Sequence, residues 1–256
     1  MDYRTTIGET MDSLRATLEQ IARWGCRGFE CSPEALATVQ RWAEAGRVSP
    51  QQDASPAPAL RGGTPATTQA EGRETLEQIR TDIGDCRRCG LASGRTHIVF
   101  GEGDAHARLV LVGEGPGADE DRSGRPFVGP AGQLLSKIVE AMKLSREQVY
   151  ICNVIKCRPP DNRDPLPEEI ASCRPFLMRQ LAAIGPEVVC TLGSHATRSL
   201  LNCAEPVSRL RGRFHTLHHF RVMPTFHPAF LLRHPEHKRD VWEDMKKIMA
   251  LLRIPL

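Results

Sequence analysis

The sequence predicts a protein of the α/β class, in which helices cover both faces of a parallel sheet. After residue 73, short apolar runs alternate with longer amphipathic segments, and strands that alternate with helices usually form such a sheet. The composition, 40% apolar and 25% charged in 256 residues, suits a globular chain with one substantial core and an appendage. Because no run of about 18 uncharged apolar residues and no export signal is visible, we expect a cytoplasmic protein of bacterial or archaeal type that acts at the nucleoid.

Each predicted element follows from its local pattern. The expected strands are the apolar runs at residues 109–112, 149–155, 188–192 and 221–225. The expected helices cover residues 131–142 and 167–184, a short stretch from Ser194, and residues 235–252. In the last helix an apolar face is predicted, formed by Val241, Met245, Ile248 and Leu252.

The chain is predicted to have three parts. Residues 1–46 contain two short apolar patterns at three- and four-residue steps, which predict a small helical extension. Residues 47–73 are rich in Pro, Ala, Gly, Thr and Gln, and they have too little apolar surface to offset the entropy of ordering, so a flexible linker is expected. Residues 74–256 carry the α/β domain.

Short unusual sequence motifs lie at the ends of the predicted strands. GEGPG at residues 113–117 follows the first strand, CNVIKCRPP ends the second, LGSHA follows the third and TFHPA the fourth. Ligands of open α/β sheets bind outside the carboxyl ends of the strands, so these words are predicted to converge on one site. GEGPG matches neither nucleotide-binding fingerprint, because it lacks both the G-x-G-x-x-G spacing and a following Lys-Ser/Thr.

The nine cysteines favour metal ligation or redox chemistry over disulfides in a chain without an export signal. Cys86 and Cys89 form a C-x2-C pair, and fifteen residues separate Cys157 from Cys173. Four such thiolates can hold zinc or an iron–sulfur cluster, and the spacing alone does not choose between them. The remaining cysteines are predicted to be ordinary core or surface thiols: Cys26, Cys31, Cys152, Cys190 and Cys203.

In their order along the chain, C-x2-C, GEGPG, GRPFVGPAG, NVIKCRPP, a further Cys and HPAFLLR resemble the family 4 uracil-DNA glycosylases, the iron–sulfur branch of the uracil glycosylase superfamily. The resemblance covers residues 75–252. It implies a three-layer α/β/α sandwich with a four-stranded parallel sheet, and a [4Fe-4S] cluster on Cys86, Cys89, Cys157 and Cys173. It also implies hydrolysis of the N-glycosidic bond of uracil in DNA, which begins base excision repair of deaminated cytosine. We expect a monofunctional enzyme, since no matched motif places a Lys as the active-site nucleophile.

The resemblance assigns three side chains to uracil. Phe127, on a loop rich in Gly and Pro, is expected to stack on the flipped base. Asn153 offers the donor and the acceptor that uracil O4 and N3–H require, whereas cytosine reverses both polarities. His227 matches the catalytic His of the superfamily, and its N–H would meet uracil O2 as negative charge develops there.

A carboxylate is expected to orient the attacking water. The best-known branch of the superfamily has an Asp at the position of Gly115, where this chain has no side chain and the backbone is free to approach uracil. Glu114 is the favoured replacement, and Glu120 is the alternative.

A net charge of only +3 means that DNA must be met by a local basic patch. Leu231 and Leu232, directly after HPAF, resemble the apolar wedge that fills the gap left by a flipped base. The predicted phosphate contacts are Arg209, Arg211, Arg213 and Arg233.

The cluster is expected to have no redox part in turnover. Because Cys157 lies four residues after Asn153, the cluster would clamp the loop that leads to Cys173 and so position the amide. We expect a monomer that acts on single- or double-stranded DNA containing uracil, with a possible replication or repair partner bound through the N-terminal extension.

Two rival hypotheses stay open. One is a relative that captures uracil-DNA covalently without turnover; that branch carries a basic insertion with a nucleophilic His, whereas residues 158–172 contain no His. The other is a structural module, held by zinc or a cluster, whose active site has decayed.

Overall fold

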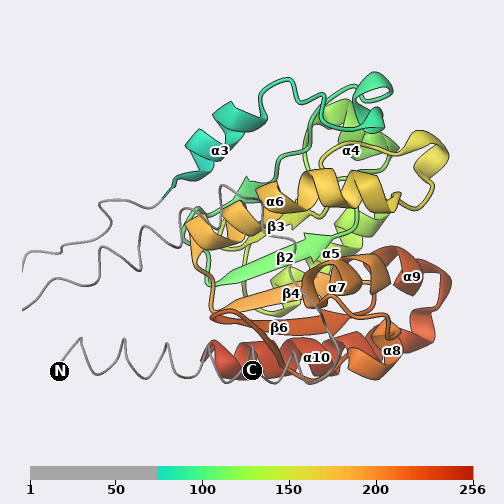
Figure 1. The fold of residues 1–256 in the computed structure, drawn as a ribbon. Helices are drawn as coiled ribbons and strands as arrows, with labels where there is room; N and C mark the ends of the chain where they lie inside the picture. Colours follow the sequence, from blue (N-terminus) through green and yellow to red (C-terminus); the bar gives the residue numbers. More distant parts are fainter. Residues whose placement is uncertain (1–73, 256) are drawn as a thin grey trace, which may run out of the picture. The chain divides into compact units, whose positions relative to one another are not determined.

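The computed structural model describes residues 74–255, so the predicted helical extension at 1–46 and the predicted linker at 47–73 lie outside the described residues. The strands are β1 (Glu102–Gly103), β2 (Leu109–Gly113), β3 (Tyr150–Asn153), β4 (Val188–Leu192), β5 (His215–Leu217) and β6 (Phe220–Thr225) (Figure 1). The helices are α3 (Leu76–Ile83), α4 (Ala118–Ser123), α5 (Pro130–Ala141), α6 (Pro167–Ile184), α7 (Ser194–Leu201), α8 (Val207–Leu210), α9 (Pro228–Arg233) and α10 (Lys238–Leu251). Short 3-10 turns lie at Gly90–Ser93, Pro160–Asn162 and Pro235–His237.

The strands form one mixed sheet in the order β1-β3-β2-β4-β6-β5. The central strands β3, β2, β4 and β6 run parallel, as predicted. The sheet has six strands rather than four, because β1 and β5 add antiparallel edges. These edge strands are two and three residues long, too short to leave a periodic signal in the sequence.

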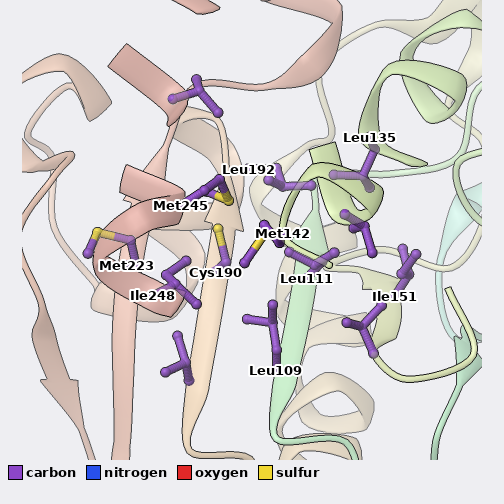
Figure 2. Close-up of a cluster of buried hydrophobic side chains, with 14 of the residues drawn as sticks. Leu109, Leu111, Leu135, Met142, Ile151, Cys190, Leu192, Met223, Met245 and Ile248 are labelled. Atoms are coloured by element: carbon purple, nitrogen blue, oxygen red, sulfur yellow. The ribbon is translucent and has the colours of Figure 1, made fainter. Parts of the chain in front are cut away.

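Successive residues of the parallel strands point to opposite faces and build two cores. On one face Leu109 and Leu111 of β2 pack with α5 and α10, and Figure 2 shows Cys190 beside them as an ordinary apolar residue. On the other face Val110 and Val112 pack with α6 and α7. The α/β class with helices on both faces is therefore confirmed.

Local capping contacts and turns set the ends of the long helices. α6 starts after Leu166, whose backbone N–H donates to Glu169 Oε2 at 2.8 Å, and it ends at Gly185 with a left-handed φ of 65°. The predicted helix at 235–252 begins instead at Lys238, after a 3-10 turn. Its predicted apolar face is buried throughout.

The parallel strands bring the motif-bearing loops to one edge of the sheet. In Figure 1 the arrowheads of β2, β4 and β6 point toward the side occupied by α4 and α9. Within the described range, no helix combines the length and apolar character needed to span a membrane. Because the parallel strands end near α4 and α9, the predicted site residues are expected at that edge of the sheet.

Candidate active site

A cavity of about 500 Å³ lies at this edge of the sheet. Seven of the predicted site residues border it, which are Glu114, Gly115, Glu120, Phe127, Asn153, His227 and Arg233. The other residues in its lining are Pro116, Gly117, Ala131, Pro159, Asn162, Arg163, Ala229 and Phe230. Loops that follow β2, β3 and β6 thus meet around one space, as predicted, whereas LGSHA after β4 contributes no residue to the lining.

Phe127 forms one wall of the cavity in a strained but well-held conformation. Its φ of 53° lies in the left-handed region, which an aromatic residue rarely adopts. Arg146 donates hydrogen bonds to the carbonyl oxygens of Pro126 at 2.8 Å and of Phe127 at 3.1 Å. The ring is buried, with its centroid 5.7 Å from that of His227. The surrounding structure therefore fixes the position of the ring.

Two glycines make room for this wall. A Cβ at Gly113 would lie 2.4 Å from Asn153 Oδ1 and 2.5 Å from Phe127 Cζ, and a Cβ at Gly132 would lie 2.0 Å from the carbonyl carbon of Phe127. Only glycine allows such close approach. The sequence contained Gly113 within GEGPG, but its role in bringing the ring and the amide together was not predicted.

Asn153 closes β3 inside the protein. Its side chain is 1% exposed, and Oδ1 has no hydrogen-bond partner among the described residues. An unpaired buried polar atom costs about 1–3 kcal/mol. A ligand with an N–H donor, placed in the cavity, would satisfy Oδ1 and remove this cost.

His227 follows β6 and caps the start of α9. Its Nδ1 accepts the backbone N–H of Ala229 at 3.1 Å, so the proton of the neutral ring lies on Nε2. Burial lowers the pKa of His227 to about 4; the Arg233 guanidinium adds to this shift, and Glu120 opposes it. The imidazole is therefore neutral at neutral pH and has one N–H to donate to a ligand.

Glu120 is tied to the backbone. Its Oε1 accepts the N–H groups of Val128 at 2.8 Å and Gly129 at 3.0 Å, and its Oε2 accepts that of Gly117 at 3.0 Å. Both oxygens are used in holding together the two loops that flank the cavity. This geometry favours a positioning role for Glu120 over contact with an attacking water.

Glu114 has a freer carboxylate. Burial raises its pKa; His195 opposes that shift and Asp164 adds to it. His195 Nε2 lies 3.3 Å from Asp164 Oδ2 and 3.9 Å from Glu114 Oε2. His195 was not predicted as a site residue, although LGSHA placed it at the correct edge; Asp164 lies in no motif.

Gly115, the next residue, lines the cavity. A Cβ there would lie 2.7 Å from Ile155 Cγ1, so the GEGPG loop lies close against the segment that follows β3.

The predicted cluster cysteines come together beside this site. Burial raises the pKa of Cys157 to about 11, with contributions from Cys173 and Cys89. Burial also raises the pKa of Cys173, with contributions from Cys89 and Cys86. The thiols are therefore within electrostatic reach of one another.

The described residues contain one compact set of side chains that could hold a metal ion. In residues 74–255, the one set of at least three His, Cys, Asp or Glu ligand atoms within 4.8 Å of one another is Glu114, Asp164 and His195. No three of the predicted cluster cysteines form such a set among the described residues. Four thiols are a donor set that suits zinc or an iron–sulfur cluster.

Positive charge surrounds these thiols. Arg95 donates to the carbonyl of Cys86 at 2.6 Å and lies 3.7 Å from Cys157 Sγ, and Arg88 lies 3.5 Å from Cys86 Sγ. The Lys156 side chain is fully buried nearby. A site built in this way suits an anionic group such as a thiolate-ligated cluster.

The predicted DNA contacts divide into two groups. Leu232 is 49% exposed, but Leu231 is 1% exposed and packs in the core with α10, because the first turn of α9 directs it inward. Arg211 donates to both carboxylate oxygens of Asp244, at 3.0 and 2.8 Å. Leu231 and Arg211 therefore serve the fold, which corrects the expectation that they contact DNA.

The other predicted phosphate contacts remain available. Arg209, Arg213 and Arg233 are exposed, and Arg233 borders the cavity.

Comparison with known proteins agrees with this geometry. The family model described as "Uracil DNA glycosylase superfamily" matches residues 100–246. A Type-4 uracil-DNA glycosylase of Thermotoga maritima is 43% identical over 184 residues, which covers 70% of this chain and 96% of that protein. Similar proteins with the same description are those of Archaeoglobus fulgidus, 42% identical over 70% of this chain and 94% of the relative, and of Sulfurisphaera tokodaii, 41% identical over 71% and 87%. The chain therefore belongs to the uracil DNA glycosylase superfamily and, within it, to the type-4 uracil-DNA glycosylases.

Proposed function

We propose that this protein removes uracil from DNA by hydrolysing its N-glycosidic bond, and that it leaves an abasic site for base excision repair. The observation that carries the proposal is the buried Asn153 Oδ1, which has no partner among the described residues and borders the same cavity as Phe127 and His227. A uracil flipped out of the helix would stack on Phe127 and donate its N3–H to this oxygen. Cytosine has no N3–H and would leave it unpaired.

His227 stabilises the leaving base. As the bond between C1′ and N1 breaks, its electron pair moves to the uracil ring and negative charge develops on O2. The Nε2–H of the neutral His227 donates to that oxygen, and one donor of this kind contributes about 3 kcal/mol to transition-state stabilisation. The hydrogen bond from Ala229 to Nδ1 fixes the tautomer that this role requires.

Glu114 orients the water that attacks C1′. Its ionised carboxylate accepts a hydrogen bond from the water and takes up the proton as the new C–O bond forms. Glu120 holds the loops of Gly117 and Val128 in place and so keeps Phe127 at the base.

Cys86, Cys89, Cys157 and Cys173 would hold a [4Fe-4S] cluster. When bound, it would supply Fe–thiolate bonds to three separate segments of the chain. Residues 74–256 act as one glycosylase domain and as a monomer, on single- or double-stranded DNA, in the cytoplasm. The predicted extension and linker, residues 1–73, lie outside the described residues, and we propose that they engage a repair partner.

Single-turnover excision tests the proposal directly. Oligonucleotides that carry one uracil, single-stranded or paired with G or A, are incubated with excess protein and then cleaved with alkali. We expect cleavage by the wild-type protein and its loss in His227→Ala and Asn153→Ala, with iron content and circular dichroism unchanged. An SDS-stable protein–DNA adduct would favour covalent capture instead, and failure of the folded wild-type protein to cut any substrate would favour a decayed site.

A further inference from the structure

Lys156 is a buried cation that the excision mechanism leaves unused. Its side chain is 1% exposed. A buried ammonium is costly unless opposite charge and hydrogen bonds compensate for its lost hydration. In the part of the chain that the structure describes, Lys156 pairs with no carboxylate, and its Nζ donates to the backbone carbonyl of Asn153 at 2.8 Å.

The other cations near the thiols are compensated. Arg95 pairs with Asp85 at 2.5 Å, and Arg88 pairs with Asp82 at 3.2 Å. Lys156 differs from them because it has no carboxylate partner among the described residues. Burial raises the pKa of the Cys173 and Cys152 thiols and the Lys156 ammonium opposes that shift, so the ammonium lies within electrostatic reach of both.

Lys156 also lies at the junction of two functional features. The next residue, Cys157, is a proposed cluster ligand, and the Nζ contact reaches back to the residue whose amide faces the cavity. The two residues between Asn153 and Lys156 pair with the GEGPG loop. The backbone N–H groups of Val154 and Ile155 donate to the carbonyls of Gly113 and Glu114 at 2.9 and 3.1 Å. A shift of the Asn153 carbonyl would therefore move both the amide and the loop that carries Glu114.

We propose that Lys156 is a positioning residue that couples the iron–sulfur cluster to the uracil-reading amide. Its ammonium is the buried counter-charge of the anionic cluster, and its hydrogen bond fixes the end of β3 from which the Asn153 side chain reaches uracil. This inference rests on the proposed function and on the proposed cluster ligands.

Two neutral variants of the full-length holoprotein separate the charge of Lys156 from its hydrogen bond. Lys156→Met keeps the side-chain volume but removes both charge and donor, whereas Lys156→Gln removes the charge and keeps a donor. Lys137→Met, on an exposed position of α5, is the matched control. The readouts are bound iron, the reduction potential of the cluster, inhibition by free uracil, and affinity for DNA with an abasic site.

Both neutral variants should move the reduction potential to more negative values, because loss of a nearby positive charge disfavours the more anionic reduced cluster. Lys156→Met should weaken inhibition by free uracil and slow excision by about 10- to 100-fold. This is the usual effect of losing a group that orients a ligand-contacting residue without touching the ligand itself. Lys156→Gln should lose less of the uracil inhibition and of the excision rate. The affinity of both variants for abasic DNA should stay within about twofold of the wild-type value.

The inference is overturned if both variants keep the wild-type reduction potential, or if free uracil inhibits Lys156→Met as strongly as it inhibits wild-type protein. Loss of iron from both neutral variants with unchanged circular dichroism, and not from Lys137→Met, supports it, because the missing ammonium is what they share. If wild-type protein does not excise uracil, the proposed function fails; the reduction potential still reports on the counter-charge separately.

Discussion

Two sets of predicted site residues, one that lines the cavity and one on the surface, are built in opposite ways. The inner wall consists of Phe127, Asn153 and His227, which are buried or half-buried and held by specific backbone contacts. The second set, called the rim below, consists of exposed residues, of which Arg233 borders the cavity: Leu232, Arg209, Arg213 and Arg233. The wall must present fixed donors and acceptors to one base, whereas the rim has to attract a flexible polyanion. Changes in the wall should therefore remove activity, and changes in the rim should only reduce it.

The largest effect is expected from the wall donor. His227→Ala removes the N–H at uracil O2 and should lower single-turnover excision about 100- to 1,000-fold, with little change in affinity for DNA. His218→Ala, an exposed residue of the loop before β6, should cut as wild-type protein does. Equal rates in the two variants would remove His227 from the mechanism.

The second-largest loss of excision rate is expected from a substitution that displaces the wall residues without removing any functional group. Gly113→Ala places a methyl group 2.4 Å from Asn153 Oδ1 and 2.5 Å from Phe127 Cζ, so the amide or the ring must shift. A displacement of about 1 Å at a reacting site can cost about 100-fold in rate. Gly94→Ala is the matched control, because a Cβ there meets nothing within 4 Å.

The carboxylate of Glu114 should set the acid side of the pH profile. Burial raises the pKa of Glu114, and only the ionised form orients water, so excision should fall as pH drops through a value above that of an ordinary Glu. Because His195 opposes the raised pKa, His195→Ala should move this acid limb to higher pH. An acid limb that stays in place in His195→Ala, or one that persists in Glu114→Gln, would count against this role.

The smallest effects are expected at the rim. Arg233→Ala should weaken DNA binding a few-fold for all sequences and lower the slope of log affinity against log salt by about 1. Arg211→Ala should leave that slope unchanged but lower the free energy of unfolding by about 3 kcal/mol, because Asp244 would remain buried without its partner. Salt titration of binding and urea unfolding of both variants separate the two roles.

The same contrast explains what the sequence could predict. The parallel strands were predictable because each is a local apolar run. The wall was predictable because its residues lie in short motifs at the ends of those strands. Arg211 and Leu231 were misjudged because their partners are distant in the sequence: Arg211 pairs with Asp244 in α10, and Leu231 packs against the same helix. Gly113, His195 and Lys156 were missed for a related reason, since their importance lies in close contacts that only the folded chain creates.

The central claim is that Asn153 Oδ1 accepts the N3–H of uracil. Single-turnover excision of uracil and of N3-methyluracil from the same oligonucleotide, by wild-type protein and by Asn153→Ala, tests it most directly. The account predicts that wild-type protein prefers uracil by at least about 100-fold, since the methyl group both removes the donor and leaves the buried oxygen unpaired. It predicts that Asn153→Ala loses most of this preference. Equal excision of the two bases by wild-type protein, or an undiminished preference in the variant, would contradict it.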